Sequence, residues 1–202
     1  MLKIGLTGGI GSGKTLVSKV FQNLGIPVYC ADDKAKQLIN ESINLKQEII
    51  SVFGDEAYIN GNYNKKFIAG IVFNDAIKLK VLNEIIHPAV EKDFINWVKE
   101  ISLKTPFILK EAAILFESGT YKQLDKIIYV TAETETRIQR VIDRDSTNRE
   151  QVINRIKNQW PTDKGKQLAD FVLDNTGKKL ILPQILDIYN QLNKEWQNLV
   201  NG

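Results

Sequence analysis

The chain carries, in Gly8-Gly9-Ile10-Gly11-Ser12-Gly13-Lys14-Thr15, the pattern G-x-x-x-x-G-K-[ST] of a phosphate-binding loop. Glycines let the backbone curl so that successive N–H groups point into one concavity, which holds phosphate oxygens. The positive end of the helix that follows faces the same anion. We therefore expect Lys14 to reach the terminal phosphates of a nucleoside triphosphate and the Thr15 hydroxyl to ligate Mg²⁺.

The flanks of the loop agree with this interpretation. Residues 2–7 form an apolar run of the length of a buried strand. After the loop, apolar residues recur at helical spacing up to Leu24, and Gly25 supplies a stop signal. Strand, glycine loop and helix is the arrangement that the motif requires. The residues expected to contact the triphosphate are Gly8, Gly9, Gly11, Ser12, Gly13, Lys14, Thr15 and Leu16.

The bulk composition is that of an ordinary soluble globular protein, with 43% hydrophobic and 25% charged residues among 202. A net charge of +3 is too small to indicate nucleic-acid binding, and no apolar run is long enough to span a bilayer. The N-terminal strand runs directly into the loop, which is not the pattern of a signal peptide. The single cysteine, Cys30, fits a reducing compartment, so we expect a cytoplasmic protein without a membrane partner.

Asp32 follows a second predicted strand, at residues 26–30. In open α/β sheets, ligands bind at the carboxyl ends of the strands. Asp32 could there accept a proton from an attacking hydroxyl, or it could hold a water of the Mg²⁺ shell. Asp32 and Asp33 also begin a predicted helix, where acids are favoured whatever else they do. Position alone leaves these roles open.

Residues 45–103 are predicted to be helical and interrupt the alternation of strands and helices, so we interpret them as an insertion at the ligand edge of the sheet. Residues 58–63 predict a tight turn between extended residues, and Asp75 can cap a helix. Pro88 suits the first turn of a further helix. His87, the only histidine, either anchors that helix junction or contacts a substrate.

Strand character returns at residues 107–109 and 127–130 and once more at 171–173, before a C-terminal amphipathic helix at about 182–199. Glu111 is an unexpected charge at the end of the first of these strands. Thr131 is a plausible cap for the helix that follows the second.

The helix after Thr131 begins a series of arginines. Arg140 and Arg144 are one helical turn apart and share a face, and Arg149 and Arg155 follow. A helical hairpin that carries arginines is typical of small kinases, in which guanidinium groups neutralise the charge on the transferring phosphoryl group. The alternative is a solvated basic face whose arginines pair with nearby acids. For the series as a whole, we favour phosphate contact.

The assembled pattern resembles the dephospho-CoA kinase family, which carries out the last step of coenzyme A synthesis. The loop by itself marks only the superfamily, whereas the His-Pro pair and the Leu-Phe-Glu stretch are more specific. The matches run in family order over nearly the whole chain. They are residues 6–15, Ala31-Asp32, His87-Pro88, Ile114–Glu117, Arg140 with Arg144-Asp145, Arg155 with Gln159, and Asp174–Gly177.

The resemblance implies an α/β fold, a three-layer P-loop kinase core with a five-stranded parallel sheet. The core would comprise about 1–32, 105–137 and 168–202, with a helical substrate subdomain at about 33–104 and a helical lid at about 138–167. The implied reaction is phosphorylation of the ribose 3′-hydroxyl of dephospho-CoA by ATP with Mg²⁺. We expect no nucleic-acid partner, and a monomer or weak homo-oligomer.

The resemblance also implies roles for individual residues. Asp32 would receive the proton of the 3′-hydroxyl, while Lys14 and Arg140 would stabilise charge on the transferred group. Arg144, Asn175 and Gly177 would contact ATP, the last two near its adenine. The residues facing dephospho-CoA would be His87, Leu115, Phe116 and Glu117.

The chain departs from the family pattern at Cys30, where the family usually has an acid, and at Ala113, where a proline is common. Glu111 is an additional candidate for Mg²⁺ binding. Three alternatives stay open at this point: a kinase for a nucleoside monophosphate or another small alcohol, a regulatory GTPase, and a non-enzymatic ATP-gated binding module. The GTPase alternative rests on the string D-x-x-G at Asp174–Gly177, but the guanine-reading N-K-x-D is absent from the sequence.

Overall fold

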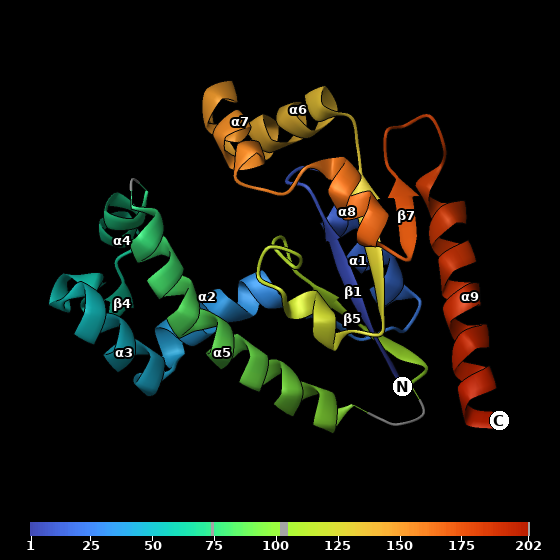
Figure 1. Cartoon of the computed structure of the whole chain (residues 1–202), viewed down its shortest axis with the longest axis horizontal. Coiled ribbons are helices and arrows are strands. Elements are labelled where there is room, and N and C mark those ends of the chain that lie inside the picture. The colour runs from blue at the N-terminus through green and yellow to red at the C-terminus, as the bar shows by residue number, and fades with distance from the viewer. Residues whose placement is uncertain (74, 102–104, 202) are drawn as a thin grey trace. The chain divides into compact units, whose positions relative to one another are not determined.

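The structure is a computed structural model that describes residues 1–73, 75–101 and 105–201. The chain divides into two compact units. The first comprises Met1–Cys30 and Ser102–Gly202 and holds the main sheet, and the second comprises Ala31–Ile101 and is largely helical (Figure 1).

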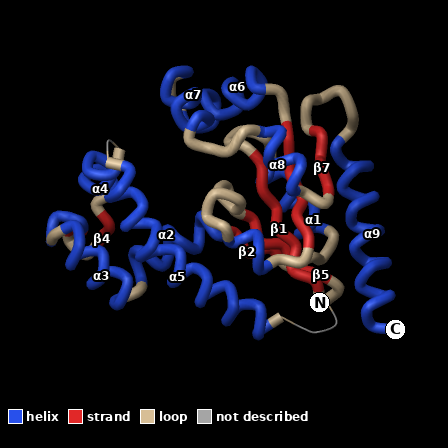
Figure 2. The backbone as a smooth tube through the Cα atoms, viewed as in Figure 1, coloured by secondary structure: helices blue, strands red, loops and turns tan. Residues whose placement is uncertain are grey.

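The main sheet has five parallel strands in the order β2-β5-β1-β6-β7, which confirms the predicted five-stranded parallel sheet. Figure 2 draws the strands in red. Its strands read as nearly continuous apolar runs because both faces of a parallel sheet are covered. β1 lies at the centre, and its carboxyl end leads directly into the glycine loop. The strands are β1 Leu2–Gly8, β2 Val28–Cys30, β5 Phe107–Glu111, β6 Lys126–Thr131 and β7 Phe171–Asp174.

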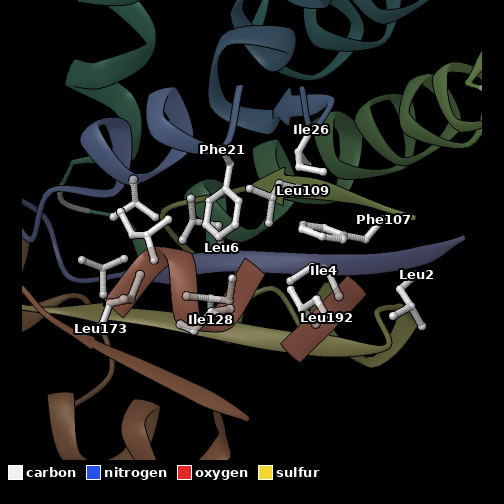
Figure 3. Close-up of a cluster of buried hydrophobic side chains, with 14 residues drawn as sticks. Leu2, Ile4, Leu6, Phe21, Ile26, Phe107, Leu109, Ile128, Leu173 and Leu192 are labelled. Carbon is white, nitrogen blue, oxygen red and sulfur yellow. The ribbon is translucent and has the colours of Figure 1, made fainter. Parts of the chain in front are cut away.

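Helices cover both faces of this sheet, as a three-layer fold requires. On one face, α1 (Lys14–Asn23) and α9 (Ile181–Asn201) contact each other and enclose the apolar cluster of Figure 3, which includes Ile4, Ile128 and Leu192. On the other face, the side chain of Tyr129 lies against α8 (Thr162–Leu168). The short 3₁₀ helix η2 (Thr120–Gln123) lies in the connection between β5 and β6.

The arginine series lies on two helices of the first unit, α6 (Thr134–Asp145) and α7 (Arg149–Lys157). Their shared apolar cluster includes Ile138, Val141 and Val152. The prediction that Thr131 caps α6 was wrong. Thr131 pairs with Asp174 at the end of the sheet, so its backbone belongs to β6. Glu133 is the N-cap residue, without a side-chain cap bond among the described residues.

Among its described residues, the second unit contains four α-helices, one short 3₁₀ helix and a small hairpin. The predicted turn at 58–63 is confirmed as a two-stranded hairpin closed by Asn60 and Gly61, both with positive φ. The predicted cap is also confirmed, because Asp75 Oδ1 accepts hydrogen bonds from the backbone N–H groups of Ile77 and Lys78. The elements are α2 Ala31–Glu41, α3 Ile43–Phe53, η1 Asp55–Ala57, β3 Tyr58–Ile59, β4 Asn62–Tyr63, α4 Lys65–Val72 and α5 Ala76–Glu100.

The prediction that a new helix begins at Pro88 was wrong, because α5 continues through it. Proline removes one backbone N–H donor, which weakens a helix interior. The apolar residues Leu82, Ile86, Val90 and Phe94 recur every four positions on both sides of Pro88 and are buried. Burial of this continuous stripe outweighs the missing hydrogen bond. Within the described ranges, no helix combines the length and the apolar character needed to cross a bilayer.

Candidate active site

The glycine loop between β1 and α1 has the backbone that its motif predicts. Gly8, Gly11 and Gly13 have φ values of 149°, 76° and 102°, a region in which side-chain-bearing residues are strained. A Cβ on Gly8 would lie 2.2 Å from the Val130 carbonyl oxygen, and one on Gly13 would lie 2.2 Å from Asn175 Nδ2. Both conformation and close packing therefore require glycine here.

Three polar side chains of the loop fit a bound phosphate chain and its metal. Lys14 Nζ donates a 2.9 Å hydrogen bond to the Gly8 carbonyl oxygen, which holds the ammonium against the loop. The Thr15 side chain is exposed at the first turn of α1. The Ser12 hydroxyl is buried and has no hydrogen-bond partner among the described residues. Such orphaned groups are costly unless a ligand or water satisfies them, so the residues present fit a triphosphate with Mg²⁺.

Arg137 packs directly on the loop, a position that sequence reasoning missed. Its side chain is only 5% exposed, its Nε donates a 2.9 Å bond to the Ile10 carbonyl oxygen, and its guanidinium group covers Gly9. Burial lowers the pKa of this guanidinium. The sequence did offer one signal that could have placed Arg137 near the loop. Arg137 precedes Arg140 by three residues and therefore shares a helix face with it.

Arg140 also reaches the loop. Its guanidinium donates to the carbonyl oxygens of Gly11, Ser12 and Asn175 at 3.5, 3.4 and 3.3 Å. These bonds are at the long end of the normal range and therefore weak. The guanidinium thus lies beside the loop without being tightly bound to it.

The other arginines of the series are engaged on the hairpin itself. Arg144 and Arg155 both donate to Asp145, with closest distances of 2.7 and 2.8 Å, and Arg149 forms a bidentate pair with Glu135 at 2.7 Å. The Arg144 guanidinium, followed by that of Arg155, lowers the pKa of Asp145 to about 2. The arginines are therefore divided between the loop and local ion pairs. The contact of this series with phosphate stays a prediction.

Asn175 and Gln159 hold the loop from two further segments. The Asn175 side chain donates a 2.8 Å bond to the Ser12 carbonyl oxygen, and its backbone N–H donates to the carbonyl oxygen of Thr131. Gln159 accepts a 2.7 Å bond from the N–H of Ile10 and donates to the Ala113 carbonyl oxygen. Gln159 was matched to the family pattern, but it was not expected to support the loop.

The turn after β7 is pre-formed. Asp174 accepts a 2.9 Å bond from the N–H of Thr176, and this hydrogen bonding keeps the pKa of its carboxyl below the ordinary value. Gly177 follows with a φ of 89°, which favours glycine. The segment predicted to approach the adenine is thus a fixed turn next to the loop-binding Asn175.

The Leu-Phe-Glu stretch lies inside the first unit. Leu115 has no exposed surface and Phe116 is 3% exposed, stacked on Tyr129 and Trp160. The expectation that these two side chains face a substrate is not met, because packing against the sheet takes up their surface. The Glu117 carboxylate accepts a 2.8 Å hydrogen bond from the backbone N–H of Trp160, so it holds the segment that follows α7 in place.

Cys30 and Glu111 are paired at the carboxyl ends of neighbouring strands. The Cys30 thiol lies 3.8 Å from a carboxylate oxygen of Glu111 and donates a weak hydrogen bond to it. The residue that departs from the family pattern and the unexpected charge therefore contact each other. This contact places Glu111 at the sheet edge where the loop begins.

Asp32 and His87 belong to the second unit. Asp32 lies in the first turn of α2, two residues beyond the end of β2, and Asp33 beside it pairs with Lys36. His87 lies within α5 and is half-buried. Across the described ranges, no group of three or more His, Cys, Asp or Glu side chains could hold a metal ion by itself.

Residues 2–180 match the sequence model of the family described as Dephospho-CoA kinase. The curated relatives include Dephospho-CoA kinase from Fusobacterium nucleatum, 43% identical over 85% of this chain and 88% of that protein, and the protein of the same name from Aquifex aeolicus, 38% identical over 98% of each.

Solved structures agree on the fold. TT1252 from Thermus thermophilus superposes with a TM-score of 0.82 at 30% identity, over 96% of this chain and 97% of that one. Dephospho-CoA kinase from Campylobacter jejuni does so with a TM-score of 0.71 at 22% identity, over 96% and 98%. The match to the family sequence model spans most of the chain. The chain belongs to the dephospho-CoA kinase family.

Proposed function

We propose that the protein transfers the γ-phosphoryl group of ATP to the ribose 3′-hydroxyl of dephospho-CoA, giving coenzyme A and ADP. One observation carries the proposal: a complete phosphate loop at the end of the central strand, faced by Arg140, in a member of this family. The loop supports a triphosphate donor, and family membership supports the acceptor.

The loop and its basic neighbours bind the donor and stabilise charge. Backbone N–H groups of the loop and Lys14 hold the phosphates, and the exposed Thr15 hydroxyl holds Mg²⁺. When bound, Mg²⁺ offsets negative charge on the phosphate oxygens. Arg140 exchanges its long bonds to loop carbonyls for the transferring group, where a charged donor is worth more.

Asp32 acts as the general base in this proposal. As the bond between the 3′-oxygen and the γ-phosphorus forms, the hydroxyl proton passes to the Asp32 carboxylate. The bond from the γ-phosphorus to the bridging oxygen breaks, and ADP leaves with the electron pair. Little covalent chemistry falls to the protein, so most of the acceleration comes from positioning and charge stabilisation.

The remaining residues divide into ligand contacts and supports. Asn175 and Gly177 approach ATP, and Arg144 does so by leaving its ion pair with Asp145. His87 contacts dephospho-CoA. Leu115, Phe116 and Glu117 support the site from within the fold, as their burial and hydrogen bonding favour. The enzyme works in the cytoplasm, as a monomer or weak homo-oligomer.

An ADP-release assay tests the reaction. The purified chain is given Mg·ATP with dephospho-CoA, AMP, CMP or no acceptor, and the product is identified by mass and by the position of its phosphate. ADP release only with dephospho-CoA, with a 3′-phosphorylated product, is the expected result. Release with AMP or CMP alone would keep the kinase fold and discard this acceptor, and no release with any acceptor would favour a binding module.

The base assignment is tested by Asp32→Asn, with Asp33→Asn as the matched control on the same helical turn. Loss of a general base costs about 10²- to 10⁴-fold, so Asp32→Asn lowers kcat by that range. ATP affinity stays within about twofold because the donor site is intact, and Asp33→Asn stays within about twofold throughout. Near-normal turnover by Asp32→Asn would remove Asp32 from the base role.

A further inference from the structure

A pocket of about 470 Å³ opens between α2, α4 and α5 in the second unit, and we call it the α2–α4 pocket. Its floor is apolar, formed by Ile39, Ile68 and Leu82, each less than 10% exposed. Tyr63 lines one side, and burial raises the pKa of its hydroxyl. The volume is in the range of small-molecule sites, which are mostly apolar with a few polar groups.

The rim of this pocket is basic. Lys36 and Lys65 both line it, and both are exposed. Lys36 pairs with Asp33 at 2.7 Å, but both side chains are 74% exposed, and a pair of this kind contributes little free energy. The pocket fits a largely apolar chain that carries negative charge at one end.

The pocket and the proposed base lie on one stripe of a single helix. Asp32 and Lys36 are four residues apart on α2, and Ile39 and Asn40 continue the same stripe. With a helical rise of about 1.5 Å per residue, the stripe from Asp32 to Asn40 spans about 12 Å. The order along the helix is a carboxylate, an ammonium and an apolar pocket.

A second pocket of this unit, about 400 Å³ and between α3 and α5, offers the opposite charge. Its lining includes Glu48, Glu84 and Asp93 with Lys92 as the basic residue. An anionic ligand is repelled by a lining of this composition. Charge therefore selects the α2–α4 pocket for a ligand with a phosphate group.

We infer that the α2–α4 pocket binds the pantetheine arm of dephospho-CoA, an inference that rests on the proposed function. The substrate presents, in order, a ribose 3′-hydroxyl, a 5′-diphosphate and an extended arm that carries methyl groups, amides and a thiol. This order matches Asp32, Lys36 and the pocket along α2. Lys65 adds a second positive charge for the diphosphate at the rim.

The first test fills the pocket. Ala69→Trp places a large side chain at a lining residue of α4, and Gly70→Trp is the matched control, since a Cβ there meets no described atom within 4 Å and Gly70 is not in the lining. We expect Ala69→Trp to raise KM for dephospho-CoA about tenfold or more. Its KM for ATP and its kcat, and all constants of Gly70→Trp, stay within about twofold.

The second test reverses a rim charge. Lys65→Glu is compared with Lys66→Glu, a neighbouring exposed lysine outside the lining. We expect Lys65→Glu to raise KM for dephospho-CoA by about threefold to tenfold, and less at high salt, because a screened charge is involved. Melting temperatures of all four variants show whether each one folds.

Direct binding separates this inference from the proposed function. Calorimetry with pantetheine 4′-phosphate measures the arm alone, and Ala69→Trp should weaken its binding about tenfold. If the wild type phosphorylates dephospho-CoA but KM is unchanged in Ala69→Trp and Lys65→Glu, the pocket is not the arm site and the proposed function stands. If the wild type does not phosphorylate dephospho-CoA, the proposed function fails. The pocket assignment is then overturned unless the wild type binds pantetheine 4′-phosphate and Ala69→Trp does not.

Discussion

The phosphate loop and the α6–α7 hairpin both contribute positive groups to the first unit, but they are specified in different ways. The loop depends on its own backbone, with positive φ values at Gly8, Gly11 and Gly13 that glycine favours. The hairpin repeats one side chain, and the tertiary partner of each copy decides its position. A motif is therefore sufficient to identify the loop, whereas only the folded structure separates one arginine from another.

The arginines of the hairpin fall into two groups with different partners. Arg137 and Arg140 donate to loop carbonyl oxygens, whereas Arg149 forms an exposed ion pair with Glu135. All three guanidinium groups have the same chemistry. The difference lies in what each one faces, so the comparison predicts effects of very different size from identical substitutions.

Arg140→Ala and Arg149→Ala give the largest expected contrast. Removing a charged donor aimed at the transferring group costs about 100-fold, so Arg140→Ala lowers kcat by that factor in the ADP-release assay. Arg149→Ala breaks an exposed pair and leaves kcat within about twofold. Equal losses in the two variants would show that the hairpin acts as one charged surface and that Arg140 has no special position on it.

A smaller effect is expected where the two regions touch. A Cβ on Gly9 would lie 2.2 Å from the Arg137 guanidinium, and the nearest atoms it meets all belong to that side chain. Gly9→Ala therefore pushes aside a buried guanidinium that is bonded to the Ile10 carbonyl oxygen. We expect it to weaken ATP binding by about 1 kcal/mol, the low end of an overpacking cost, because the displaced atoms end a flexible side chain. Arg137→Ala in the same chain removes the clash.

The double variant makes this contact testable. ATP affinities of Gly9→Ala, Arg137→Ala and the double variant form a thermodynamic cycle, with a coupling of about 1 kcal/mol or more expected. We expect the double variant to bind ATP better than Gly9→Ala alone, because removing the Arg137 side chain relieves the clash. Additive losses would mean that the loop tolerates a methyl group at Gly9 and that Arg137 does not control its position.

Much of the fold could be predicted because its signals are local. The strands of the main sheet are apolar runs, and the caps and stops, such as Asp75 and Gly25, follow from side-chain chemistry and positive φ. The errors came where distant packing decides. Pro88 lies inside a helix because a buried stripe runs past it, and Thr131 belongs to a strand because it pairs with Asp174.

In the candidate site too, the features set by local sequence were predicted and those set by contacts with distant residues were not. The loop residues were predicted by motif and have the expected conformation. The hydrogen bonds that Arg137 and Gln159 make to the loop were not predicted, because these residues are 127 and 149 positions away from Ile10 in the sequence. Nothing in their neighbourhoods indicates which backbone group they bind. Leu115 was expected to face a substrate because it belongs to a stretch that matches the family. A sequence match does not reveal which way a side chain points, and Leu115 is buried.

The smallest effect concerns the acid that holds the hairpin arginines. Asp145 has an ordinary pKa of 3.8, lowered to about 2 mainly by Arg144. The folded state binds a proton on Asp145 less tightly than the unfolded state does. The stabilisation of the fold by the ionised carboxylate is therefore complete above about pH 4 and is lost as pH falls toward 2.

The ion pairs of Asp145 lie near the surface, so Asp145→Asn costs at most about 1 kcal/mol of unfolding free energy, or about 2–4 °C in Tm at pH 6. The Tm difference from the wild type should shrink as pH is lowered from 4 toward 2. Asp143→Asn, whose carboxylate accepts a bond from Gln139 on the same helix, serves as the control and should show no such convergence. A Tm difference for Asp145→Asn that is constant with pH would mean that its arginine pairs do not stabilise the hairpin through charge.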